Sequence, residues 1–290
     1  MTTQFDRRRH PVRKDLAARA YEGRVEADRF VDGYKKIIAT SVLDFRKDPR
    51  SDQSIDTQGL FGEVVTVFEE ASDGWAWVQL ETDGYVGWVS ADALADPVEP
   101  THRVTALNSF CYSGPDLKLP RVGALSIGSR IRVIGEKTTR DLLYFQLSDH
   151  SYVVARHVAS LSEPGHQDWV AVAEQFLNVP YLWGGRSGAG LDCSALVQLA
   201  LAEGGVEIPR DSDMQEAEIG HLLPLDTPLK SLTRGDLIFW KGHVGIVQGQ
   251  NQLLHANGHT MTVASEALDE AVRRIGENEF GAVTAIKRLS

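Results

Sequence analysis

Residues 184–197 read GGRSGAGLDCSALV, a glycine-rich loop that runs into an apolar segment at Cys193. Apolar residues at helical spacing over Ser194–Ala202, with Gly204-Gly205 as a stop signal, predict a helix that begins near this cysteine. A thiol at a helix N-terminus feels the positive end of the helix dipole, which stabilises a thiolate. Lone cysteines are more often structural, but a core cysteine needs no preceding glycine-rich loop. We therefore interpret Cys193 as a nucleophile.

A thiol nucleophile also needs an imidazole base and a group that orients it. Of the nine histidines, two stand out: His243 opens one strand-like apolar run and His255 ends the next, twelve positions later. A turn around Gly249–Asn251 between antiparallel neighbours would bring the two side chains together. Zinc is the competing use of one cysteine and two histidines, but these spacings match no compact zinc pattern. We expect neither a metal nor a cofactor.

The segment after Pro164 has the pattern of an α+β unit of about 125 residues that begins with helices. Trp169–Leu177 has helical apolar spacing and precedes the helix at Cys193. Four strand-like segments follow: Leu237–Trp240, Val244–Val247, Gln252–His255 and Val283–Ile286.

The first part of the chain matches itself at an offset of 67 residues. Glu69 then falls on Glu136, Gln79 on Gln146, and Tyr85 on Tyr152. Short strands such as Glu63–Phe68, Trp75–Leu80 and Val86–Val89, separated by tight turns, are typical of small SH3-like β-barrels. The repeat predicts two such barrels; the alternative is one larger β-domain with chance self-similarity.

Linkers at Asp96–Pro100 and Ser162–Gly165 set the predicted boundaries. We expect an N-terminal helical segment over 1–33, in which Lys14–Phe30 forms the helix. A first SH3-like domain would span 34–97, a second would span 98–163, and the α+β domain would span 164–290.

Composition narrows the class of protein. A net charge of −10 over 290 residues disfavours a nucleic-acid partner. Two cysteines, Cys111 and Cys193, make no disulfide framework. No apolar run is long enough to span a membrane, and the basic cluster Arg7–Arg9 is not followed by the apolar region of a signal peptide. We expect a cytoplasmic monomer with no membrane partner.

Several blocks after residue 167 resemble the NlpC/P60 family of cysteine peptidases, in order and with consistent spacing. They are Pro180–Gly185, Leu191–Val197, Ile208–Gln215, Arg234–Trp240, His243–Ile246 and Leu254–Ala256. The resemblance implies a papain-like core that hydrolyses peptidoglycan peptides, usually at the γ-D-glutamyl bond to a diamino acid. It makes Cys193 the nucleophile, His243 the base and His255 the orienting residue. It also implies substrate contacts from Tyr181, Trp183, Asp192, Ser194 and Ser212.

The residues before the first linker resemble the first bacterial SH3 domain of the YkfC-type branch of that family, through Asp56–Glu63 and Asp83–Val89. The resemblance implies that this domain covers one end of the cleft, and that Glu63 and Tyr85 hold the free amine of an N-terminal L-Ala. At the 67-residue offset Glu63 falls on Arg130, so its carboxylate is not required by the barrel. Tyr85 falls on Tyr152 and could equally be a core aromatic.

Together these features predict a γ-D-glutamyl-L-diamino acid endopeptidase (dipeptidyl-peptidase VI). It would act through a Cys193 thioester on murein tri- and tetrapeptides with a free N-terminal L-Ala, in cell-wall peptide recycling. One alternative is an acyl- or amide-transferring enzyme on the same core. The other is a non-catalytic SH3 protein that binds wall peptides. The sequence leaves open whether the diamino acid is diaminopimelate or lysine.

Overall fold

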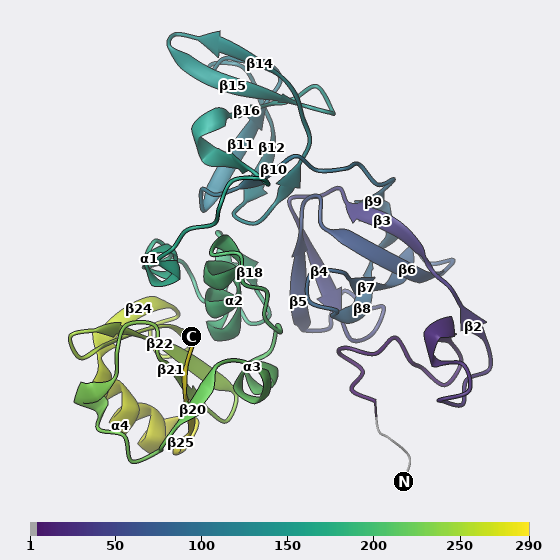
Figure 1. The fold of residues 1–290 in the computed structure, drawn as a ribbon. Helices are drawn as coiled ribbons and strands as arrows, with labels where there is room; N and C mark the ends of the chain where they lie inside the picture. Colours follow the sequence, from purple (N-terminus) through teal and green to yellow (C-terminus); the bar gives the residue numbers. More distant parts are fainter. Residues whose placement is uncertain (1–4, 290) are drawn as a thin grey trace. The chain divides into compact units, whose positions relative to one another are not determined.

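The computed structural model describes residues 5–289, which divide into two compact units between Glu163 and Pro164 (Figure 1). The first unit is almost entirely β-sheet, and the second combines helices with one sheet. No helix among the described residues is long and apolar enough to cross a membrane.

Residues 34–95 of the first unit form one antiparallel sheet with the order β5-β4-β8-β7-β6-β3-β9. Two of its strands, β4 and β6, alternate buried and partly exposed side chains, as half-buried strands do. Their inward residues, among them Phe45, Val65, Val67, Val78 and Leu80, make one core. The strands are β3 (Tyr34–Ile38), β4 (Val42–Arg46), β5 (Ile55–Leu60), β6 (Val64–Glu70), β7 (Trp75–Leu80), β8 (Val86–Ser90) and β9 (Leu94–Ala95).

Residues 102–160 repeat this strand order in two pieces, β12-β11-β16-β15-β14 and β13-β10-β17. A separate core of Val104, Leu125, Ile131, Leu147 and Val153 fills the second copy. Its strands are β10 (His102–Val104), β11 (Asn108–Tyr112), β12 (Arg121–Ser126), β13 (Arg130–Ile131), β14 (Val133–Thr139), β15 (Leu142–Leu147), β16 (Tyr152–Val154) and β17 (Val158–Ser160). Each copy also has a single 3₁₀ turn before its last strand, at Ala91–Ala93 and Ala155–His157.

The ungapped offset of 67 residues is wrong outside β7 and β15. The Leu60 N–H donates to the Glu63 carboxylate at 2.7 Å, and in the second copy the Ser126 N–H donates to the Ser129 hydroxyl at 3.2 Å. Glu63 therefore corresponds to Ser129, at an offset of 66. Arg130 is not its counterpart, because the second copy gains one residue only later, before β15.

The same correction applies to Tyr85. The Leu80 N–H donates to the Tyr85 carbonyl, and the Leu147 N–H donates to the Ser151 carbonyl. Tyr85 thus corresponds to Ser151, and the expected pairing of Tyr85 with Tyr152 is wrong. Tyr85 is 3% exposed, so it is buried at a position where the second copy has a small polar residue.

The two copies touch at Gly62, whose φ of 77° suits glycine. The Arg130 N–H donates to the Phe61 carbonyl at 2.8 Å. A Cβ on Gly62 would lie 1.9 Å from the Arg130 carbonyl oxygen. The backbones therefore meet where only glycine leaves room.

The predicted helix over Lys14–Phe30 is wrong. That region holds only β1 (Ala17–Ala18), a 3₁₀ turn at Arg19–Tyr21 and β2 (Phe30–Val31). Leu16, Ala17 and Ala18 are buried consecutively, and Leu16 packs against Trp77 and Val86 of the first sheet. Burial of three successive residues suits an extended segment lying on a barrel, so tertiary packing overrides the helical propensity of the alanines.

The second unit is built on a six-stranded antiparallel sheet with the order β20-β25-β21-β22-β23-β24. Its strands are β20 (His221–Leu223), β21 (Leu237–Trp240), β22 (His243–Gly249), β23 (Gln252–Asn257), β24 (Thr262–Ala267) and β25 (Val283–Arg288). The four strands expected from the sequence are present, and β20 and β24 are additional. A short hairpin, β18 (Arg186–Ser187) and β19 (Gly190–Leu191), precedes the nucleophile helix.

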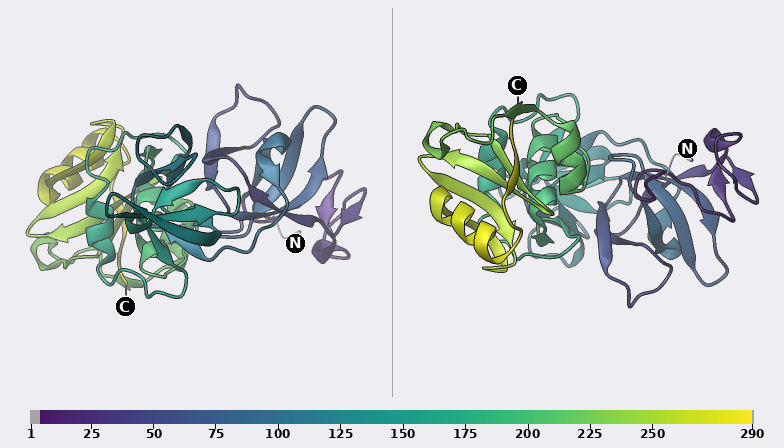
Figure 2. Two further views of the ribbon diagram at one scale, coloured as in Figure 1. Left: turned by 90° about the horizontal axis from the view of Figure 1, so that it is seen from above. Right: turned by 90° about the horizontal axis from the view of Figure 1, so that it is seen from below.

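Helices cover both faces of this sheet (Figures 1 and 2). The helix α2 (Cys193–Glu203) contacts β22 and β23, whereas α4 (Leu268–Asn278) packs on the other face through Leu268, Ala271 and Ile275. Two shorter helices, α1 (Trp169–Glu174) and α3 (Ser212–Glu218), adjoin α2. The predicted order, helices first and strands after, is correct except that α4 follows β24.

Candidate active site

Cys193 is the first residue of α2 and is 7% exposed. The glycine-rich loop before it folds back on itself. A Cβ on Gly185 would lie 2.7 Å from the Gly190 carbonyl oxygen, so this loop needs glycine. The backbone N–H groups of Val244 and Ser194 donate towards the Cys193 sulfur. Val244 follows His243 directly in β22, so the packing of α2 on the sheet places the thiol against the residue next to the predicted base.

Asp192 is the N-cap of α2 and holds the start of the helix in place. Its Oδ1 accepts a hydrogen bond from the Ala195 N–H at 2.9 Å, and its Oδ2 accepts one from the Gly184 N–H at 3.1 Å. Arg210, whose side chain is fully buried, donates to both oxygens at 2.9 and 2.7 Å and also to the Ser194 hydroxyl. An acidic N-cap with a two-pronged arginine partner fixes the backbone that carries Cys193.

His243 and His255 form a direct pair: His243 Nε2 lies 2.8 Å from His255 Nδ1. A two-residue turn joins β22 to β23. Its residues, Gln250 and Asn251, have φ of 51° and 60°, which is the geometry of a type I′ hairpin. Both histidines are buried, at 2% and 0% exposure. The sequence prediction that this hairpin joins the two imidazoles is therefore correct.

Aromatic rings enclose the imidazole of His243. Phe280 stacks on it with ring centroids 5.0 Å apart and an interplanar angle of 6°, and Trp240 lies at 5.6 Å. A ring held between neighbours in this way has few orientations open to it, so its hydrogen bond to His255 is maintained.

Burial controls the protonation of the thiol and the imidazole. It raises the pKa of Cys193 to about 12, with the nearby Asp192 charge adding to the effect, and the Val244 and Ser194 N–H groups oppose it. Burial, followed by the charges of His255 and Arg274, holds the pKa of His243 well below its usual range. Both shifts favour a neutral thiol and a neutral imidazole before substrate binds. Burial thus opposes the thiolate that the positive end of the helix dipole favours, and the state of the thiol at neutral pH stays a prediction.

The chain matches two protein families in separate parts. Residues 45–94 match the bacterial dipeptidyl-peptidase SH3 domain, and residues 178–274 match the NlpC/P60 family. A γ-D-glutamyl-L-lysine dipeptidyl-peptidase of Bacillus subtilis is 30% identical, over 71% of this chain and 73% of its own length. Dipeptidyl-peptidase 6 of Lysinibacillus sphaericus is 34% identical, over 79% of this chain and 90% of its own.

The chain belongs to the NlpC/P60 family of cysteine peptidases. The resemblance drawn from the sequence is thereby confirmed, and so is the prediction of an enzyme. The fold agrees with that of an NlpC/P60 family protein from Bacillus cereus, with a TM-score of 0.71 and 22% identity over 88% of this chain and 99% of the other.

The substrate contacts predicted for this NlpC/P60 domain differ in their surroundings. Trp183 is 66% exposed in the loop before β18, and Ser212 is half-buried at the start of α3. Ser194 and Asp192 are bonded to each other and to Arg210. Asp192 and Ser194 therefore hold the first turn of α2 in place, and their contact with substrate stays a prediction.

Tyr181 is half-buried and close enough to Cys193 for their charges to interact. Burial, and then the nearby Cys193 and Asp192, raise the pKa of its hydroxyl. The hydroxyl thus stays protonated and can donate a hydrogen bond beside the nucleophile. Glu63 and Tyr85 belong to the first unit, and their contact with substrate stays a prediction.

Sequence reasoning assigned no role to several residues that build this site. Arg210 lies in a block that was recognised, but nothing in the sequence shows that its guanidinium is buried on Asp192. Phe280 lies beyond the residues that match the family. Glu266 accepts a hydrogen bond from His255, and Arg274 pairs with Glu266. Within residues 5–289, no three or more His, Cys, Asp or Glu side chains gather in a way that could hold a metal.

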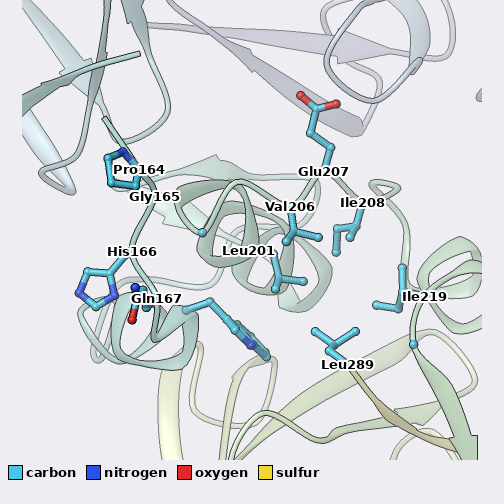
Figure 3. Close-up of a pocket in the computed structure, with 13 residues that line it drawn as sticks. Pro164, Gly165, His166, Gln167, Leu201, Val206, Glu207, Ile208, Ile219 and Leu289 are labelled. Carbon is cyan, nitrogen blue, oxygen red and sulfur yellow. The ribbon is translucent and has the colours of Figure 1, made fainter. Parts of the chain in front are cut away.

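A cavity of about 610 Å³ lies at the other end of α2. Figure 3 shows side chains that line it, among them Leu201, Val206, Ile208, Ile219 and Leu289. None of the three predicted catalytic residues lines this cavity. We therefore assign it no part in the chemistry.

Iodoacetamide should alkylate Cys193 slowly at pH 7 and progressively faster as the pH rises towards 10, because the pKa of the buried thiol is raised. Mass spectrometry of the labelled peptide, with time courses at each pH, measures the rate. Cys111, whose pKa burial raises to about 11, serves as the internal reference. A labelling rate at Cys193 that is already maximal between pH 6 and 8 would contradict this result and would indicate a preformed thiolate.

Proposed function

We propose that this peptidase hydrolyses the γ-D-glutamyl bond to the L-diamino acid in short peptidoglycan peptides. The observation that carries the proposal is the hydrogen-bonded His243–His255 pair, together with the buried thiol at a helix N-terminus that accepts from the N–H of Val244, the residue after His243. The substrate class is supported by the names of the relatives, one of which is a γ-D-glutamyl-L-lysine dipeptidyl-peptidase and another a dipeptidyl-peptidase 6.

The reaction proceeds in two stages on this geometry. The Cys193 sulfur attacks the carbonyl carbon of the γ-glutamyl amide while His243 accepts the thiol proton. The tetrahedral intermediate carries an oxyanion, to which the Tyr181 hydroxyl and the N–H groups at the start of α2 can donate. His243 then gives the proton to the leaving amine of the diamino acid. Water, deprotonated by His243, hydrolyses the remaining thioester and releases the dipeptide.

We further propose that the enzyme requires a free N-terminal L-Ala, held by Glu63 and Tyr85. Glu63 accepts hydrogen bonds from the Leu60 N–H at 2.7 Å and the Thr82 hydroxyl at 2.8 Å. The corresponding turn in the second copy is served by the uncharged Ser129. The turn thus needs an acceptor but not a negative charge. The negative charge of Glu63 suits a substrate ammonium group.

The repeated strand order supports two SH3-like domains, over 34–97 and 98–163, ahead of the catalytic domain over 164–290. We propose that the protein works as a cytoplasmic monomer on murein tri- and tetrapeptides released during wall turnover. A requirement for a free amine would fit such soluble peptides better than intact wall, in which that amine is blocked.

Incubation with murein tri-, tetra- and pentapeptides tests the proposed bond. Each peptide should be supplied with lysine and with diaminopimelate, and the products identified by mass spectrometry. We expect the dipeptide L-Ala-D-Glu from every substrate that is cut, together with a fragment that begins with the diamino acid. Cleavage at any other bond would contradict the proposal, and the ratio of rates identifies the preferred diamino acid.

A further inference from the structure

The chain of polar contacts at the site continues beyond His255. His255 Nε2 lies 2.6 Å from the Oε1 of Glu266, and Arg274 donates to the same oxygen at 2.6 Å. Arg274 also pairs with Glu279. Glu266 belongs to β24, where His255 is paired with Ala264, two positions away. Alternate residues of a strand share a face, so this register points Glu266 at His255, while α4 supplies Arg274.

The charge of Glu266 determines which atoms in this chain carry protons. The hydrogen bond from His255 lowers the pKa of Glu266 to about 2, and Arg274 acts in the same direction. Glu266 is therefore ionised throughout the working pH range, and an ionised carboxylate can only accept hydrogen bonds. It follows that His255 must carry its proton on Nε2.

The position of the proton on His255 determines the position of the proton on His243. A neutral His255 that is protonated on Nε2 has a lone pair on Nδ1, and Nδ1 faces His243 Nε2 at 2.8 Å. His243 must then carry its proton on Nε2 and donate it to His255. That leaves His243 Nδ1 unprotonated, and this is the nitrogen not occupied by His255.

We propose that Glu266, held by Arg274, is a positioning residue that fixes the tautomers of both histidines and so makes His243 Nδ1 the atom that accepts the thiol proton. The inference rests on the proposed roles of Cys193 and His243. It goes beyond them in assigning a four-member chain of His243, His255, Glu266 and Arg274. Glu266 also stabilises the positive charge that arises when His243 is protonated, as the buried carboxylate does in other triads.

Glu266 and Arg274 have opposite effects on the pKa of His243, because their charges have opposite signs. The negative charge of Glu266 raises that pKa, whereas the positive charge of Arg274 lowers it. The acid limb of kcat/KM reports protonation of the base in the free enzyme. Glu266→Gln should therefore move this limb to lower pH, and Arg274→Gln should move it to higher pH. Damage to the fold alone would lower the rate without such a pair of opposite shifts.

Glu266→Gln preserves the size of the side chain and should lower kcat roughly 10- to 100-fold, the range typical when the hydrogen-bond partner that orients a metal-bound histidine is lost. Glu277→Gln is the matched control. Glu277 is an exposed carboxylate on α4 that pairs with Arg273, so this variant should keep the wild-type rate and pH profile. Circular dichroism and Tm establish that each variant is folded. Wild-type kinetics in Glu266→Gln, or a lower rate with an unmoved acid limb, would overturn the proposal.

Nitrogen-15 NMR of the histidine rings tests the same inference without relying on activity or on any change at Glu266. In the unaltered protein at neutral pH we expect both His243 and His255 to be protonated on Nε2 and unprotonated on Nδ1. A proton on His255 Nδ1 would overturn the tautomer assignment whatever the enzyme cleaves. Failure of the proposed peptide cleavage with the expected tautomers would instead count against the substrate, so the two failures can be distinguished.

Discussion

Cys193→Ala should lower kcat/KM for peptide cleavage by at least about 10⁴-fold, because the sulfur is the atom that forms the thioester and no other group in the site can replace it. His243→Ala should be nearly as harmful, since members of a catalytic set act as a unit. His255→Ala should cost less, roughly 10²- to 10³-fold, because it acts on the base and not on the substrate. Steady-state kinetics on one defined tripeptide measures all three.

The order of the histidine effects is the informative part of this comparison. A larger loss from His255→Ala than from His243→Ala would reverse the roles assigned to them. Cys193 is buried, with 7% of its surface exposed. Removing its sulfur therefore leaves a small void, with a cost of about 1 kcal/mol in the free energy of unfolding. A Tm measurement separates this cost from the loss of catalysis.

Acetylation of the N-terminal L-Ala of the substrate should lower kcat/KM roughly 100- to 4,000-fold. The ammonium group is the proposed partner of Glu63, which is 4% exposed. Leaving one member of a buried charged pair without the other costs about 3–5 kcal/mol, and each 1.4 kcal/mol is a factor of about ten. Comparing L-Ala-γ-D-Glu-L-Lys with its N-acetyl form measures the effect. Similar values for the two peptides would contradict both the free-amine requirement and the recycling role.

Comparison with the second barrel suggests a substitution at Glu63 that removes only its negative charge. In the second barrel the Ser129 hydroxyl accepts the equivalent hydrogen bond from a backbone N–H of the turn. Glu63→Ser therefore keeps an acceptor in the turn and removes the carboxylate. This variant should narrow the difference between free and acetylated peptides, chiefly by losing activity on the free one. Ser129→Ala is the control: it removes the turn acceptor of the second copy and should leave the preference for a free amine unchanged.

Local sequence patterns predicted the parts of the fold that depend on neighbours along the chain. The loop and helix at Cys193 are specified by glycines, an acidic N-cap and apolar spacing within twenty residues. The His243–His255 hairpin is likewise local, because a short turn fixes the register of its strands. These were also the residues whose chemistry could be assigned before the structure was known.

Features that depend on distant contacts could not be predicted. The segment around Leu16 is extended because it is buried against Trp77 and Val86, and its alanine-rich sequence indicated a helix. The ionised Glu266 is eleven residues from His255 in the sequence and resembles any surface glutamate until β24 is paired with β23. Relative to the first copy, the second copy is one residue longer before β15 and one residue shorter after it. The ungapped comparison missed both changes because it aligned Gln79 with Gln146 and kept that offset throughout. Strand pairing reveals them, because it is read from backbone hydrogen bonds.

The position of β25 bears on where a working catalytic fragment can be cut. The residues recognisable as NlpC/P60 stop at 274, but β25 (Val283–Arg288) lies inside the sheet, between β20 and β21. Phe280, in the connection before β25, is the ring stacked on His243. A fragment trimmed to the recognisable motifs would keep Cys193, both histidines, Glu266 and Arg274. It would nevertheless expose the backbone edges of β20 and β21 and leave the His243 ring free to rotate. A fragment expressed for activity therefore has to extend past Arg288.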